Sequence, residues 1–142
     1  MTATAATTTG ITWKATLASA GIAVAGGLII NTVIALAARG LGAPDEFKQL
    51  TIAVYGPLTV IGALLATVAW RLIVNHSGNA ARVLRIVVPV VLVLSLIPDA
   101  LLLSSDSQPG TTTGGVIALM LMHFGVAAAA VPAFRRLMPP RS

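Results

Sequence analysis

Residues 83 to 103 read VLRIVVPVVLVLSLIPDALLL, an apolar run that is long enough to cross a bilayer. Asp99 lies inside this run, in the segment Ser95-Leu96-Ile97-Pro98-Asp99. A carboxylate within a membrane span needs a partner, because an ionised side chain in hydrocarbon is costly and usually faces the interior of a helix bundle. The rest of the chain is therefore expected to bring polar groups to Asp99.

The composition indicates a membrane protein with a single domain. Of 142 residues, 56% are hydrophobic and only 9% are charged, whereas a soluble domain is about one quarter charged. Most of the charged residues lie between or near the ends of apolar runs of about the length that a spanning helix needs. The sequence thus predicts an all-α membrane protein, a four-transmembrane-helix bundle over residues 13–138, with spans at about 15–38, 50–74, 83–103 and 115–134.

Two spans carry small residues at every fourth position, which is typical of closely packed membrane helices. In the first span the row is Ala15, Ser19, Ala23, Gly27, Asn31 and Ala35, and in the fourth it is Gly125, Ala129 and Ala133. We expect Ser19, Ala23, Gly27, Gly125 and Ala129 to serve helix packing. The first row can pack inside the bundle or against a second copy of the chain, so a homo-oligomer is one expectation.

The segments outside the spans give three further expectations. Residues 1–12 are mostly Thr and Ala and predict a disordered cytoplasmic tail. A signal peptide is the alternative interpretation of the first span, because Ala35-Leu36-Ala37 resembles a cleavage site. The apolar run is, however, longer than that of a signal peptide. Asp45 and Glu46 follow Pro44 and are expected in the first turn of the second helix.

The basic residues predict the orientation of the chain. Seven of them lie near the span ends that share a side with the N-terminus, against two on the other side; the seven are Lys14, Arg71, Arg82, Arg85, Arg135, Arg136 and Arg141. Loops rich in Lys and Arg stay in the cytoplasm. We expect both termini to be cytoplasmic.

At this orientation every span places a polar or irregular feature in its outer part. Asp99, Asn31, Tyr55 and His123 are the candidate ligand-binding or proton-site residues, and together they predict a polar pocket that opens to the outside. Two alternatives stay open: Asp99 is a solvated acid at a helix end, or His123 and Asn31 only hydrogen-bond between helices. An Asp–His pair in the membrane suits proton coupling or general acid–base chemistry.

Several classes of function are excluded or disfavoured. The chain has no cysteine, which excludes disulfides and thiolate chemistry. One Asp and one His make a poor metal site, and no phosphate-binding loop or nucleophile motif is present, so we expect no metal, no cofactor and no catalytic residue. The net charge of +5 does not indicate nucleic-acid binding, because the basic residues flank apolar runs and form no stripe.

Several motifs together resemble a known family. They are Asn31, Pro57-Leu58-Thr59, Arg85-Ile86-Val87, Leu94-Ser95-Leu96-Ile97-Pro98-Asp99, Thr112-Thr113-Gly114-Gly115-Val116, Ala118-Leu119-Met120-Leu121-Met122-His123 and Val131-Pro132. Over residues 13–135 the chain resembles small actinobacterial four-span proteins classed as domain of unknown function 6069. The resemblance implies this fold and a bacterial inner (cytoplasmic) membrane, and it transfers no activity.

Three hypotheses on function follow. The first is a non-enzymatic membrane protein whose outer pocket binds a small apolar ligand or a lipid, or supports a membrane complex. The second is a small proton-coupled transporter, which with four spans needs to oligomerise. The third is a membrane enzyme that uses Asp99 and His123 as acid and base on an apolar substrate.

Overall fold

Four long helices account for most of the described chain. The computed structural model describes residues 10–104 and 108–141. Its elements are α1 (Trp13–Gly40), η1 (Lys48–Leu50), α2 (Ile52–His76), α3 (Ala80–Leu101), η2 (Leu102–Ser104) and α4 (Thr113–Leu137). All four α-helices are long and apolar enough to cross a membrane. The predicted fold class, a four-helix membrane bundle, is confirmed.

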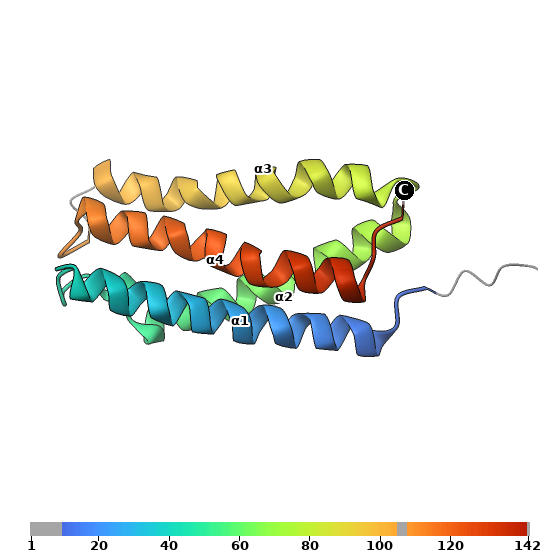
Figure 1. Cartoon of the computed structure of the whole chain (residues 1–142). Coiled ribbons are helices and arrows are strands. Elements are labelled where there is room, and N and C mark those ends of the chain that lie inside the picture. Colours follow the sequence, from blue (N-terminus) through green and yellow to red (C-terminus); the bar gives the residue numbers. More distant parts are fainter. Residues whose placement is uncertain (1–9, 105–107, 142) are drawn as a thin grey trace, which may run out of the picture.

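The helices form an antiparallel bundle in which α4 is central. Figure 1 shows α1 and α4 side by side, α3 along the other flank of α4, and α2 behind them. α1 makes its most extensive contacts with α4, whereas the contacts of α3 with α2 and α4 are sparse. The bundle is therefore tight around α1 and loose around α3.

Glycines allow α1 and α4 to pack closely. A Cβ atom added to Gly125 would lie 2.6 Å from Ile30 Cγ2, and one added to Gly26 would lie 2.9 Å from Ala129 Cβ. Close helix approach through small residues is the main source of packing energy between membrane helices. The row of Ser19, Ala23, Gly27, Asn31 and Ala35 is buried inside the single chain.

The surface of the bundle is apolar, whereas its interior contains small and polar side chains. Leu17, Ile29 and Val33 of α1 and Leu65 of α2 are exposed, whereas Thr67 is buried and donates a hydrogen bond to the Ala63 carbonyl. A helix that exposes large apolar side chains all along its length needs an apolar solvent. The arrangement fits a multi-pass membrane protein.

Each end of the bundle has its own apolar cluster. At one end Trp70 packs on Phe134 with ring centroids 5.3 Å apart, and its indole N–H donates to the Met138 carbonyl. At the other end Phe47 is fully buried with Leu50 and Val116. The two clusters hold the helices together at both ends.

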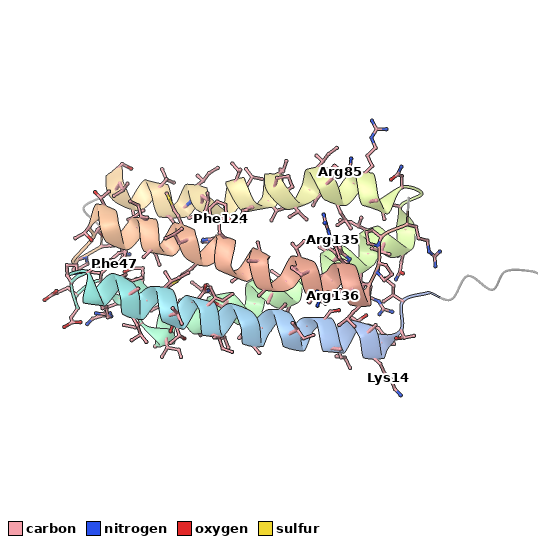
Figure 2. All side chains as sticks on the ribbon, in the orientation of Figure 1. Lys14, Phe47, Arg85, Phe124, Arg135 and Arg136 are labelled. Atoms are coloured by element: carbon pink, nitrogen blue, oxygen red, sulfur yellow. The ribbon has the colours of Figure 1, made fainter. Side chains whose placement is uncertain are left out.

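The ends differ in charge as well. Figure 2 shows Lys14, Arg85, Arg135 and Arg136 at the end where α1 begins and α4 finishes, with Phe47 at the opposite end. At the same basic end the Arg71 guanidinium lies 4.0 Å from the centre of the Trp13 ring. Stacking of this kind keeps the cation and the aromatic ring together at the membrane interface.

The helices extend beyond the apolar runs because polar residues cap them. The Thr12 side chain accepts from the Ala15 N–H, and Asn79 accepts from the Arg82 N–H, so α1 and α3 begin before the expected positions. Residues 1–9 of the expected tail lie outside the described residues.

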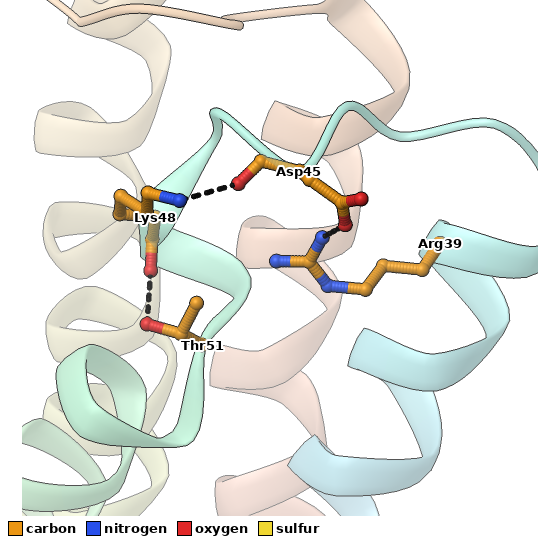
Figure 3. A network of polar contacts seen from close by, with 4 residues as sticks. All are labelled: Arg39, Asp45, Lys48 and Thr51. Carbon is orange, nitrogen blue, oxygen red and sulfur yellow. Dashed lines mark hydrogen bonds and ion pairs between the residues drawn. The ribbon is translucent and has the colours of Figure 1, made fainter.

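The expected start of the second helix at Asp45 and Glu46 is wrong. α2 begins at Ile52, and its first turn contains no acidic residue. Figure 3 shows the reason: Asp45 forms an ion pair with Arg39 at the end of α1, and its carbonyl accepts from the Lys48 ammonium at 3.0 Å. Thr51 donates to the Lys48 carbonyl at 2.6 Å. These contacts hold the segment in a turn and a short 3-10 helix.

Candidate functional site

The loose packing of α3 leaves a cleft of about 530 Å³ between α2, α3 and α4. We call it the interhelical cleft. Its α3 wall is made of branched apolar side chains, among them Val87, Val88 and Val91, and the facing walls carry small residues such as Gly62, Ala66 and Ala127. Large side chains opposite small ones leave a space that the chain itself does not fill. The volume lies within the usual range for small-molecule sites, roughly 300 to 1,000 Å³.

All four candidate site residues, Asp99, Asn31, Tyr55 and His123, line this cleft. They come from four different helices, and they lie toward the end that holds the Phe47 cluster. The structure thus brings the four side chains to one part of one cleft. This polar layer opens into an apolar cleft between helices, and this shape was not expected.

Asp99 and His123 are in contact. His123 Nδ1 lies 3.2 Å from Asp99 Oδ2 and 3.1 Å from the Leu119 carbonyl oxygen, one turn back on α4. Both neighbours of this nitrogen are acceptors, so Nδ1 carries the proton in either charge state of the ring. The Asp99 side chain is only 14% exposed, which places it in the cleft and excludes a solvated helix-end acid.

Asn31 and Tyr55 belong to a second polar group on the α1 side of the cleft. Asn31 Nδ2 donates to Thr59 Oγ1 at 2.9 Å, and Thr59 in turn donates to the Tyr55 carbonyl at 2.8 Å. The Tyr55 hydroxyl shares a hydrogen bond of 2.9 Å with Thr32. Hydrogen bonds between membrane helices stabilise their association, so these residues join α1 to α2 and also form part of the cleft wall.

Three acceptor atoms at this end of the cleft lack a hydrogen-bond donor within the described part of the chain. They are Asn31 Oδ1, Gln49 Oε1 and Asp99 Oδ2, and each is buried. The Nδ1 hydrogen of His123 is aligned with the Leu119 carbonyl, so the short distance to Asp99 does not give Oδ2 a well-aligned hydrogen bond. Buried acceptors without donors are rare and call for an explanation.

The opposite end of the cleft is apolar. Trp70, Phe134 and Leu84 line it, and all three belong to the buried cluster at the basic end of the bundle. From His123 to Phe134 the cleft extends about 16 Å along α4, at the rise per residue of a helix. It thus has the form of an amphiphile site, with one polar and one apolar end.

The cleft opens sideways, between α2 and α3. On α2 its wall includes Leu58, Gly62, Ala66 and Ala69, all exposed and on one face of the helix. Opposite them Val91 of α3 is also exposed. The α4 wall is covered throughout, because each of its lining residues is buried or half-buried. In a membrane the side opening faces the lipid.

Sequence reasoning missed Gln49, Thr59 and the small residues of α2. Thr59 follows Pro57-Leu58 in a motif that the family resemblance included, and the four-residue spacing of Gly62 and Ala66 is the same signal that identified the rows in α1 and α4. Gln49 had no such signal, since it lies in the connection before α2. Among the described residues, no three His, Cys, Asp or Glu side chains are grouped as a metal site.

Comparison with known proteins identifies the family. The sequence model of a family of unknown function, DUF6069, matches residues 4–139. The chain belongs to this family. The match spans all four helices of this DUF6069 chain. No curated protein and no solved structure matches the sequence significantly.

Proposed function

We propose that this chain is a binding protein of the bacterial cytoplasmic membrane, which holds a lipid or another small apolar molecule in the interhelical cleft. The observation that carries the proposal is the cleft itself: about 530 Å³, apolar along most of its length, and open sideways between α2 and α3, where exposed residues line it. Pockets of this size with a few convergent polar groups are the usual form of ligand sites. We propose binding without catalysis, because the polar end offers one acid–base pair, and the nearby Ser95 hydroxyl donates to the Leu92 carbonyl at 2.7 Å and not to that pair.

Blocking the cleft should abolish binding. A Cβ atom added to Gly62 would meet nothing within 4 Å, so Gly62→Leu extends into the cleft without displacing a neighbour. Trp70 lines the cleft, and in a Trp13→Phe background it is the single tryptophan. We expect a lipid with a brominated chain to quench Trp70 fluorescence in nanodiscs, and Gly62→Leu to remove most of this quenching.

Gly21→Leu is the matched control, because Gly21 also has open space around its Cβ position but lies on α1, away from the cleft. It should keep the quenching of the Trp13→Phe parent. Equal quenching in Gly62→Leu and in the parent would mean that the lipid reaches Trp70 from outside, and the proposal would then be wrong.

A proton-coupled carrier is the second candidate, and one observation favours it: Asp99 and His123 are 3.2 Å apart within the span region. Paired ionisable residues inside a membrane commonly mark proton relays. Four helices are few for a transport path, so such a carrier would act as a homo-oligomer. Proton flux into proteoliposomes that depends on an added substrate, and that is lost in Asp99→Asn, would favour the carrier over the binding protein.

We also propose that the basic end of the bundle faces the cytoplasm, as the distribution of Lys and Arg favours. Reporter fusions at Gln108 and after Arg141 test this orientation. An alkaline phosphatase fusion should be active at Gln108 and inactive after Arg141, and a fluorescent protein that matures only in the cytoplasm should give the opposite pattern. Reporters that place both positions on one side would contradict the proposal.

A further inference from the structure

Two buried side-chain oxygens at the polar end of the interhelical cleft, Gln49 Oε1 and Asp99 Oδ2, have no hydrogen-bond donor within residues 10–104 and 108–141, and both residues line the cleft. Asp99 Oδ2 lies 3.2 Å from His123 Nδ1 but makes no well-aligned hydrogen bond to it, and the third such oxygen, Asn31 Oδ1, faces Gly125 of α4, 3.3 Å from the position of an added Cβ atom. An unsatisfied buried acceptor is costly, and a carboxylate oxygen is more costly than an amide oxygen.

Hydrogen bonds from three side chains at this end of the cleft go to other groups of the protein. Asn31 Nδ2 donates to Thr59, and Gln49 Nε2 donates to Gln108 at 2.7 Å. The Nδ1 hydrogen of His123 is aligned with the Leu119 carbonyl. The Asp99 carboxylate, which only accepts hydrogen bonds, is then the main group at this end of the cleft that a donor of an entering molecule would pair with.

The remainder of the cleft selects for an apolar chain. Its walls beyond the polar end are aliphatic and aromatic, up to Trp70 and Phe134, and the side opening between α2 and α3 faces the lipid. A molecule that enters from the bilayer can place its chain against the α3 valines and its polar end beside Asp99 and Gln49.

We propose that the interhelical cleft selects amphiphiles whose polar end donates hydrogen bonds and carries no negative charge: a long-chain primary amine or alcohol. An ammonium group supplies three N–H donors and no acceptor, and a hydroxyl supplies one donor. A carboxylate or phosphate group would instead bring further acceptors beside Asp99. The proposal rests on ligand binding in this cleft, and it adds the chemical class of the ligand.

Competition between amphiphiles that share one chain length tests the selection. In nanodiscs of the Trp13→Phe protein, a brominated lipid quenches Trp70, and each competitor is titrated for its ability to relieve the quenching. The competitors are hexadecylamine, hexadecanol, hexadecyltrimethylammonium and methyl palmitate. The first two donate hydrogen bonds, the third has the positive charge without a donor, and the fourth has acceptors only.

We expect hexadecylamine and hexadecanol to compete about tenfold more strongly than the other two, which is the size of effect that one good hydrogen bond to a charged group gives. Relief by the amine alone would identify an ammonium ligand, and relief by both donors would include hydroxyl ligands. Asp99→Leu and, separately, Gln49→Leu should each reduce the preference at least about threefold, because each removes one acceptor. Asp45→Asn is the control, since Asp45 lies in the loop beside Arg39.

The outcomes separate this inference from the proposal on which it rests. Equal competition by all four amphiphiles, or by the amine and the trimethylammonium compound, would overturn selection by hydrogen-bond donors and leave binding in the cleft intact. An unchanged preference in both Asp99→Leu and Gln49→Leu would also overturn it. Quenching that no competitor relieves would count against ligand binding in the cleft as a whole.

Discussion

Phe47→Ala should cost about 3 kcal/mol of stability, the range expected for removing a fully buried aromatic ring. Phe47 is 0% exposed and lies in the connection between α1 and α2. Its ring covers Gly115 at the start of α4, where an added Cβ atom would lie 2.8 Å from Phe47 Cδ1. The ring thus anchors the connection to α4, and its loss would leave a cavity at this end of the bundle.

The measurement is unfolding of the purified protein by SDS in mixed micelles, followed by Trp70 fluorescence. Leu41→Ala is the matched control, because Leu41 lies in the same connection and is 90% exposed; we expect a change within about 0.5 kcal/mol. Phe47→Ala unfolding at the same SDS fraction as Leu41→Ala would show that the buried ring does not stabilise this end.

The spans could be predicted from the sequence because length and hydropathy alone determine them. The helix ends could not be, since they depend on single capping residues outside the apolar runs. Asn79 starts α3 at Ala80, and the Thr112 side chain accepts from the Gly115 N–H and starts α4 at Thr113. A hydropathy profile identifies apolar runs, but it contains no information on the single hydrogen bond that caps a helix.

The acidic residues of the first connection illustrate a second limit. Asp45 and Glu46 fit the first turn of a helix by the usual preference of acids for that position. The ion pair of Asp45 with Arg39 competes with this preference and places α2 further along the chain. A sequence pattern gives the preference of each residue for a position in a helix. It does not show an ion pair with a residue on the other side of a turn.

The polar residues of the cleft could be predicted and the cleft could not. Asp99 and His123 are conspicuous within apolar runs, and both face the bundle interior. On α3, however, the residues of the inner and outer faces are equally rich in Val and Leu, and only Ala80 and Leu84 are buried. Ser95 and Asp99 identify the inner face of α3, but the Val and Leu residues around them do not reveal how loosely α3 packs, and the loose packing creates the cleft.

Gly27→Leu should destabilise the fold more than any other substitution of a small residue in the α1 row. Gly27 is buried where α1, α2 and α4 meet, and an added Cβ atom would lie 3.1 Å from Thr59 Cγ2 and 3.3 Å from Val126 Cγ2. A leucine adds three more carbons beyond that position, which the helices cannot accommodate without moving apart. Overpacking of this kind costs about 1 to 3 kcal/mol or more, and separation of α1 from α2 would also break the Asn31–Thr59 hydrogen bond.

The expected result is a lower SDS midpoint for Gly27→Leu together with loss of the monodisperse peak on size exclusion. Gly21→Leu controls for the change in helix propensity, because its Cβ position has nothing within 4 Å. Since the row is buried within one chain, the variant should unfold without first passing through a folded species of lower mass. A stable Gly27→Leu protein that dissociates from a dimer to a folded monomer would instead mean that this face of α1 packs between chains.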